Sequence, residues 1–257
     1  MRPQSKEEEM GDDGQYINVN GLKTYYEVHG EGEPLLLMHG GFCTIETFFG
    51  QTPELAKRYR VILPERRGHG RTADVTGPIT YDAMAQDTIG FMEALGVPNA
   101  HLVGYSDGGI LGLIVAMRRP DLVKRFVSIS ANFDCDGLTE EGRAWVQSAT
   151  AETLVPFLVE AYKRLSPDGP DHWPIIFEKI RHMALTEPKI KPQELATIKA
   201  PTLVMAADRD LMTLEHTVAL FQAIPSAQLC VIPGTTHGLI FEKAARVNQA
   251  VLDFLAG

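Results

Sequence analysis

Long apolar runs are missing from this 257-residue sequence. Glycine, proline or charged residues interrupt every apolar stretch well short of the roughly 20 residues that a membrane-spanning helix requires. A signal peptide needs an apolar segment near its start, whereas residues 1–10 carry Lys6 followed by three glutamates. We therefore expect no membrane partner and no export by that route.

Cysteine is also scarce. The three cysteines, Cys43, Cys135 and Cys230, are odd in number and lack metal-site spacing, which makes a cytoplasmic protein with reduced thiols the simplest interpretation. No group of histidines, cysteines or carboxylates has the spacing of metal ligands, so we expect neither a metal nor another cofactor.

Positive charge is in deficit. The chain has 24 Lys and Arg against 33 Asp and Glu, a net charge of −9, and the two signs are interspersed. Nucleic-acid binding requires a clustered basic surface, so we expect no nucleic-acid partner.

The apolar pattern divides the chain into three parts. Residues 1–15 have almost no apolar surface and are predicted to form a disordered polar tail. Residues 16–133 and 199–257 alternate strands with helices, which predicts an α/β core, a mostly parallel central sheet with helices on both faces. Residues 134–198 are helical in pattern without strands, and we expect a lid insertion of two to four helices over the sheet.

The expected core elements follow from periodicity and from turn residues. The predicted strands cover residues 16–19, 22–28, 34–38, 60–64, 100–105, 126–130, 202–206 and 228–232. The predicted helices cover residues 53–60, 81–95, 108–117 and 214–223, and a single last helix carries Ile240, Ala244, Val247, Val251 and Phe254 on its core face.

One stretch carries the strongest chemical signal. Gly104-Tyr105-Ser106-Asp107-Gly108 stands between an apolar strand and an apolar helix, the order that raises a serine above a sheet edge on a sharp turn. Neighbours two positions either side of such a serine come too close for a Cβ, which explains the glycines. Ser106 is therefore the candidate nucleophile.

A serine hydroxyl needs a base, and the base works best when a carboxylate fixes its tautomer. The loops after the two last predicted strands supply both groups. Ala207-Asp208-Arg209-Asp210 follows one strand, and Gly234-Thr235-Thr236-His237 follows the next.

These motifs together resemble the α/β-hydrolase family over the chain beyond residue 15. The matching pieces are His39-Gly40-Gly41, Arg67-Gly68-His69-Gly70, Gly104-Tyr105-Ser106-Asp107-Gly108-Gly109, Asp208-Arg209-Asp210 and His237-Gly238. The resemblance implies the order Ser, Asp, His, with Ser106 as nucleophile and His237 as general base and acid.

The resemblance also implies an acid in the 208–210 loop. We prefer Asp210, because the family usually has Gly-x-x-Asp there and Ala207 stands in for the glycine. Asp208 remains the alternative; it is otherwise a turn cap or a partner of Arg209.

The resemblance also implies an oxyanion hole and a pocket. Its amide donors are Asp107 N–H and the N–H of Phe42 or Gly41, a choice that the sequence leaves open. Aromatic and apolar residues near the motifs are expected to wall the pocket, with helix packing as the alternative role of Trp173. These are Phe42, Tyr105, Phe133, Trp173 and Leu239.

The leading functional hypothesis is a carboxylesterase-type serine hydrolase that cleaves small-molecule carboxylic esters through an acyl-enzyme, as a monomer or homodimer. Lactonase, amidase or perhydrolase chemistry on the same triad are alternatives. A small-molecule receptor that retains the fold is an alternative of a different class.

Within the family that the sequence resembles, Asp107 is unusual, because lidded members more often have Met, Gln or Leu after the nucleophile. Its carboxylate either interacts with the positive N-terminus of the following helix or receives a cationic group of the substrate. The second interpretation rests on resemblance to the Gly-x-Ser-Asp-Gly-Gly branch with valacyclovirase-type hydrolases, whose aspartate receives the substrate's α-amino group.

Overall fold

The computed structural model describes residues 14–257. The predicted polar tail lies outside this range apart from its end, where Gln15 begins the first strand. Within the described residues, no helix is long and apolar enough to cross a membrane.

An eight-stranded sheet forms the centre of the protein, with the strand order β1-β2-β4-β3-β5-β6-β7-β8. The strands are β1 (Gln15–Val19), β2 (Leu22–His29), β3 (Glu33–Met38), β4 (Tyr59–Pro64), β5 (Ala100–Tyr105), β6 (Val123–Ile129), β7 (Thr202–Arg209) and β8 (Ala227–Thr236). All neighbours from β4 to β8 are parallel, and β1 and β2 pair antiparallel at one edge. The carboxyl ends of the parallel strands therefore meet along one side of the sheet, as the alternating sequence pattern predicts.

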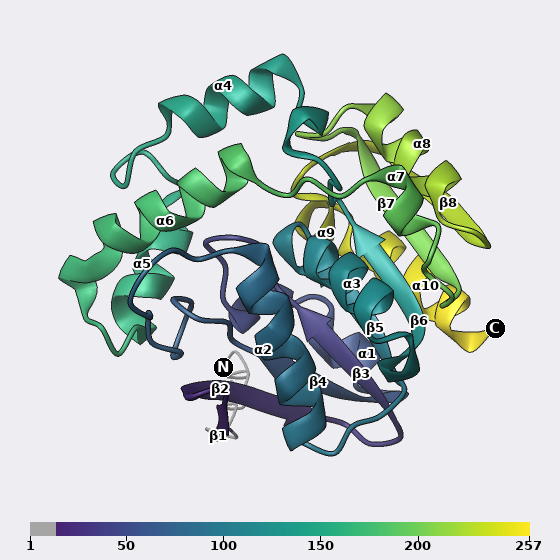
Figure 1. The fold of residues 1–257 in the computed structure, drawn as a ribbon, viewed down its shortest axis with the longest axis horizontal. Helices are drawn as coiled ribbons and strands as arrows, with labels where there is room; N and C mark the ends of the chain where they lie inside the picture. Colours follow the sequence, from purple (N-terminus) through teal and green to yellow (C-terminus); the bar gives the residue numbers. More distant parts are fainter. Residues whose placement is uncertain (1–13) are drawn as a thin grey trace, which may run out of the picture.

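Helices cover both faces of this sheet (Figure 1). Helices α2 (Tyr81–Ala94), α3 (Asp107–Arg118) and α8 (Leu214–Ala223) bury apolar side chains in one core cluster. Helices α1 (Thr52–Leu55) and α10 (Ala244–Ala256) contribute to the other. Helix α3 is buried along almost its whole length, which agrees with its apolar sequence.

The segment between β6 and β7 forms a helical cap. It contains α4 (Glu140–Ser148), α5 (Pro156–Leu165), α6 (Trp173–Thr186) and the short α7 (Pro192–Leu195). Figure 1 shows α4, α5 and α6 standing apart from the sheet on one side. Asp74 of the core fastens α6, because its Oδ2 accepts hydrogen bonds from Lys179 Nζ at 2.6 Å and lies 2.9 Å from His172 Nε2.

Two predicted helices differ from the structure. The helix expected at 53–60 ends at Leu55, since β4 already begins at Tyr59. The expected single last helix is interrupted at Lys243, so that α9 (Leu239–Glu242) precedes α10.

Candidate active site

Ser106 occupies a strained turn between β5 and α3. Its backbone lies at φ 53° and ψ −120°, a conformation that costs energy for any residue with a side chain. A Cβ on Gly104 would come within 2.2 Å of the Gly108 carbonyl oxygen, and one on Gly108 within 2.1 Å of the Met38 carbonyl oxygen. Only glycine fits these two positions, which is the steric reason expected from the motif.

Ser106, His237 and Asp210 form a chain of hydrogen bonds. His237 Nε2 lies 3.1 Å from Ser106 Oγ, and His237 Nδ1 lies 2.7 Å from Asp210 Oδ1. The three residues follow β5, β8 and β7, so the parallel sheet brings together positions far apart in the sequence. With Nδ1–H donating to the carboxylate, Nε2 is an acceptor for the serine proton.

Asp210 is held by several donors. Ala207 N–H donates to Oδ2 at 3.2 Å and Leu211 N–H to Oδ1 at 2.8 Å. The hydroxyl of Ser130 also donates to Oδ2. Burial by itself raises the pKa of Asp210, but the charge of His237 and the hydrogen bonds from His237, Ser130 and Ala207 lower the pKa below its ordinary value.

Ser130 is a site residue that the sequence reasoning missed. It directly follows β6 on the same sheet edge, is 2% exposed, and has a left-handed backbone with φ 51°. That conformation is uncommon for serine. The signal was available, because the strand predicted at 126–130 ends on the edge where the triad was expected.

Asp208 has a different role. Its carboxylate accepts hydrogen bonds from Gly234 N–H at 2.8 Å and Thr235 N–H at 3.0 Å. It therefore caps the turn that leads into the His237 loop. Those amides hold the pKa of Asp208 below its ordinary value.

The loop after β3 passes beside the nucleophile. A Cβ on Gly40 would lie 3.2 Å from Ser106 Cβ, and Phe42 adopts a left-handed backbone with φ 58°. Buried Arg66 holds this loop, since its guanidinium donates to the carbonyls of His39 and Gly40. Among residues 14–257, no acceptor is found for the N–H of Gly41, Phe42 or Asp107.

The Asp107 carboxylate points into the interior. It is 7% exposed, Tyr81 Oη donates to its Oδ1 at 2.8 Å, and its Oδ2 has no partner among the described residues. Burial raises the pKa of Asp107, and the Arg66 guanidinium and the Tyr81 hydroxyl partly offset that effect. Asp107 is the first residue of α3 and directly follows Ser106. Its carboxylate is therefore both a negative charge at a helix N-terminus and a neighbour of the nucleophile.

Ser106 opens into a cavity of about 430 Å³. Predicted wall residues Phe42 and Tyr105 line it, and Tyr105 Oη donates to the His237 carbonyl at 2.9 Å. The sequence reasoning missed most of the remaining wall, which comes from the cap, from the start of α2 and from the residues after Asp210 and His237. These residues include Tyr81, Trp145, Val155, Phe157, Met212 and Phe241.

Phe133, Trp173 and Leu239 are not among the lining residues, which corrects the expected wall. The Phe133 ring stacks on His216 with centroids 4.0 Å apart. Trp173 packs edge-on against Phe42 and donates to the Ala151 carbonyl at 2.8 Å, the helix-packing role kept as its alternative. Leu239 is 0% exposed in the core.

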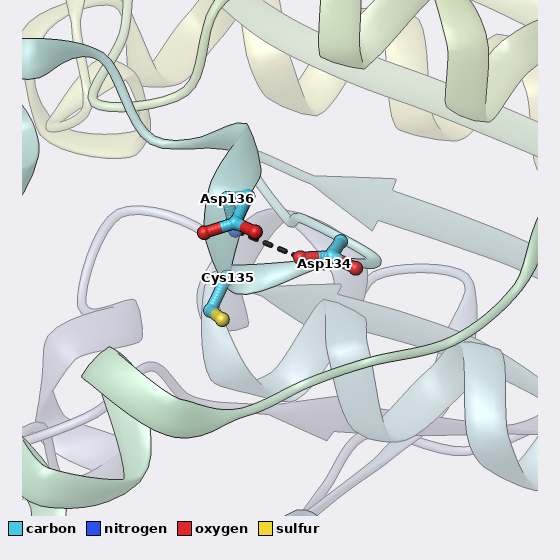
Figure 2. Close-up of side chains that lie close together, drawn as sticks. All are labelled: Asp134, Cys135 and Asp136. Atoms are coloured by element: carbon cyan, nitrogen blue, oxygen red, sulfur yellow. Dashed lines mark hydrogen bonds between the residues drawn. The ribbon is translucent and has the colours of Figure 1, made fainter.

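Figure 2 shows three consecutive residues at the start of the cap segment, Asp134, Cys135 and Asp136. Each offers one atom that could bind a metal ion, and these atoms lie within 4.8 Å of one another. Spacing along the sequence did not predict this group. Asp134 caps a short 3-10 helix by accepting Asp136 N–H at 2.8 Å, and Asp136 pairs with Arg143 at 2.9 Å. Capping and pairing account for the two carboxylates.

Comparisons with known proteins agree with this architecture. The sequence model of the Alpha/beta hydrolase family matches residues 35–250. RutD of Caulobacter sp. (strain K31), whose name proposes carbamate hydrolysis, is 33% identical over 93% of this chain and 97% of its own length. Human serine hydrolase BPHL is 28% identical over 93% of this chain and 85% of its own.

A similar structure extends the agreement to the fold. The enol-lactonase from Burkholderia xenovorans LB400 superposes with a TM-score of 0.78 at 22% identity, covering 95% of this chain and all of its own. At that identity the likeness shows the fold alone.

Proposed function

The chain belongs to the alpha/beta hydrolase family, and we propose that it is a serine hydrolase that cleaves small carboxylic esters through an acyl-enzyme. The observation that carries this proposal is the chain of hydrogen bonds from Ser106 through His237 to Asp210 at the floor of a largely apolar cavity. Such an arrangement activates a hydroxyl for attack on a carbonyl carbon.

In the first half of the reaction, Ser106 Oγ attacks the ester carbonyl carbon while His237 Nε2 takes the hydroxyl proton. Asp210 stabilises the imidazolium that forms. When the tetrahedral intermediate collapses, the bond to the alcohol oxygen breaks and His237 gives its proton to that oxygen. The alcohol leaves, and the acyl group stays on Ser106.

In the second half, His237 takes a proton from water, and the resulting hydroxide attacks the acyl carbon. The bond to Ser106 Oγ breaks, and His237 returns the proton to it. The carboxylic acid is released and the resting enzyme is regenerated.

The oxyanion of each intermediate needs donors. We propose Asp107 N–H and the N–H of Phe42 or Gly41, which have no other acceptor within residues 14–257. Oxyanion donors typically contribute about 3 kcal/mol each to transition-state binding. The Arg66 guanidinium donates hydrogen bonds to the carbonyls of His39 and Gly40. These bonds fix the loop that carries the second donor, which supports the proposed oxyanion hole.

Carbamate or amide hydrolysis is a second candidate, favoured by the 33% identity to RutD. The same nucleophile and base would serve it, but nitrogen is a poorer leaving group and needs protonation by His237 before it departs. A substrate panel separates the two candidates.

The test combines labelling with turnover. A fluorophosphonate probe should label Ser106 rapidly, and p-nitrophenyl acetate or butyrate should be hydrolysed over many turnovers. Ser106→Ala and His237→Ala should each lower kcat by at least about a thousandfold. The panel then compares matched esters, lactones, amides and carbamates, and ligand binding with no turnover of any of them would favour a receptor instead.

A further inference from the structure

A second hollow of about 280 Å³ adjoins the catalytic cavity. We call it the outer groove; its walls include Thr47, Phe49, Phe157, Leu158, Arg164 and Phe241. Phe157, Leu158 and Phe241 also line the catalytic cavity, so the two hollows share one wall.

Aromatic side chains from α5, from α9 and from the segment before α1 meet in this groove. The Phe241 ring of α9 stacks on Phe49, with centroids 5.9 Å apart, and meets Phe157 of α5 edge-on at 6.2 Å. Phe49 is nevertheless 70% exposed and Phe157 52% exposed. Large apolar side chains gathered at the surface mark a binding site more often than isolated ones do.

The charged residues of the groove are either paired or exposed. Arg164 donates to both carboxylate oxygens of Glu46, and Arg71 also contacts Glu46 at 3.2 Å. Glu160 stands exposed at the edge. An occupant of the aromatic wall therefore has no unpaired buried charge to satisfy, which favours a neutral, apolar group.

We propose that the outer groove is a second substrate subsite that binds the distal alkyl or aryl part of an ester whose carbonyl lies at Ser106. The inference rests on the proposed function and assigns its substrate class: esters with one extended apolar chain. A chain that outgrows the catalytic cavity would pass over Phe157 and Phe241, which border both hollows, and would cover the exposed ring of Phe49. The apolar area removed from water there supplies the binding energy.

The test measures kcat/KM for p-nitrophenyl esters with acyl chains of two to ten carbons and for acetate esters of alcohols of the same lengths. Wild type should gain up to about fourfold per added methylene in one of the series once the cavity is filled. In that series, Phe49→Ser should lower the ratio of kcat/KM for the eight-carbon substrate to kcat/KM for the two-carbon substrate about five- to tenfold. Ile175→Ser is the matched control, since Ile175 is 50% exposed but lines neither hollow.

An unchanged ratio in Phe49→Ser, or an equal loss in Ile175→Ser, overturns the subsite. If Phe49→Ser instead alters self-association or binding to phosphatidylcholine vesicles while the ratio stays constant, the aromatic face serves a second copy or a lipid surface, which also overturns it.

A binding experiment separates this inference from the proposed activity. Ser106→Ala protein is titrated with N-octylacetamide and N-ethylacetamide, which need no turnover. If no ester is hydrolysed but the octyl compound binds about tenfold more tightly and Phe49→Ser removes the difference, the esterase proposal fails and the subsite stands. Equal affinity of the two amides overturns the subsite.

Discussion

At the scale of single residues, the two aspartates at the end of β7 make different contacts. The Asp210 carboxylate lies 2.7 Å from the ring nitrogen of His237, whereas the Asp208 carboxylate accepts hydrogen bonds from backbone amides of the neighbouring turn. We expect Asp210→Asn to lower kcat by about 10³ to 10⁴, because an amide neither fixes the required tautomer nor stabilises the imidazolium. Asp208→Asn should stay within about threefold of wild type, since its amide oxygen still accepts one N–H. Steady-state ester hydrolysis checks both, and reversed severities would move the acid to Asp208.

Ser130 positions the acid. Removal of its hydroxyl in Ser130→Ala takes one donor from Asp210 Oδ2, and hydrogen bonds to charged groups contribute about 1.5 to 3 kcal/mol. We expect kcat to fall about tenfold. The acid limb of the kcat/KM profile should move to higher pH. The reason is that an Asp210 carboxylate with one hydrogen-bond donor fewer attracts the proton on His237 Nδ1 more strongly.

Ser128 is the control for this change. It lies two residues earlier in β6, is 1% exposed, and its hydroxyl has no partner among the described residues. Ser128→Ala therefore removes an equally buried hydroxyl without touching Asp210. Equal kinetic effects of the two alanine variants, or an unshifted pH profile in Ser130→Ala, would reduce Ser130 to a packing residue.

Asp107 tests whether the cavity recognises a cation. One of its carboxylate oxygens accepts a hydrogen bond from Tyr81 and the other is buried without a partner among the described residues; Asp107 and Tyr81 both line the cavity. A substrate ammonium group that reached this carboxylate would form a charge-assisted pair worth about 1.5 to 3 kcal/mol. We expect a ten- to hundredfold preference for valine esters over isovalerate esters of the same alcohol, which Asp107→Asn removes.

The control for Asp107 is the neutral ester itself. Asp107→Asn should hydrolyse isovalerate esters within a few-fold of wild type, because the backbone N–H at this position is retained. Equal kcat/KM for the two wild-type substrates would leave the carboxylate as a helix-terminal charge.

At the scale of elements, strand ends were the predictable part of the site. Ser106, Asp210 and His237 each follow a strand with a clear apolar run, and parallel strands share one carboxyl edge. The same reasoning extends to Ser130 after β6, which has no motif to draw attention to it. The interruption at Lys243 was hidden, because the apolar stripe from Ile240 to Phe254 continues in step across it.

The cavity wall was the unpredictable part. Periodicity tells which face of a helix is buried, but not whether it faces the core or a substrate. Trp173 and Phe157 both belong to cap helices, yet the first packs under Phe42 and the second borders the cavity. That difference depends on how α5 and α6 dock, which long-range contacts such as Asp74 with Lys179 determine.

At the scale of the whole molecule, buried histidines link folding to pH. Burial lowers the pKa of His39, His69, His101 and His216 below the ordinary histidine value, for His69 to about 3. Unfolding exposes them, and their pKa returns to about 6.5. Below that pH the unfolded chain binds more protons than the folded one, so these groups reduce stability as the pH falls. Glu65 acts in the opposite direction, because burial raises its pKa to about 7.

His69→Gln isolates one of these contributions. His69 is 2% exposed, and its Nδ1 lies 2.9 Å from the Arg67 carbonyl, a contact that a glutamine amide can replace. The unfolded histidine binds a proton at pH 5.5 and the folded one does not, a difference of about 1.4 kcal/mol between pH 7.5 and pH 5.5. The free energy of unfolding from urea titrations should therefore fall by about 1.4 kcal/mol less in His69→Gln than in wild type over this range. The control is His182→Gln, at an exposed position of α6, which should lose as much free energy of unfolding as wild type over this range. The contribution of Glu65 cancels from the comparison, because all three proteins contain it. An identical loss in His69→Gln and wild type would mean that the folded protein also protonates His69 at pH 5.5.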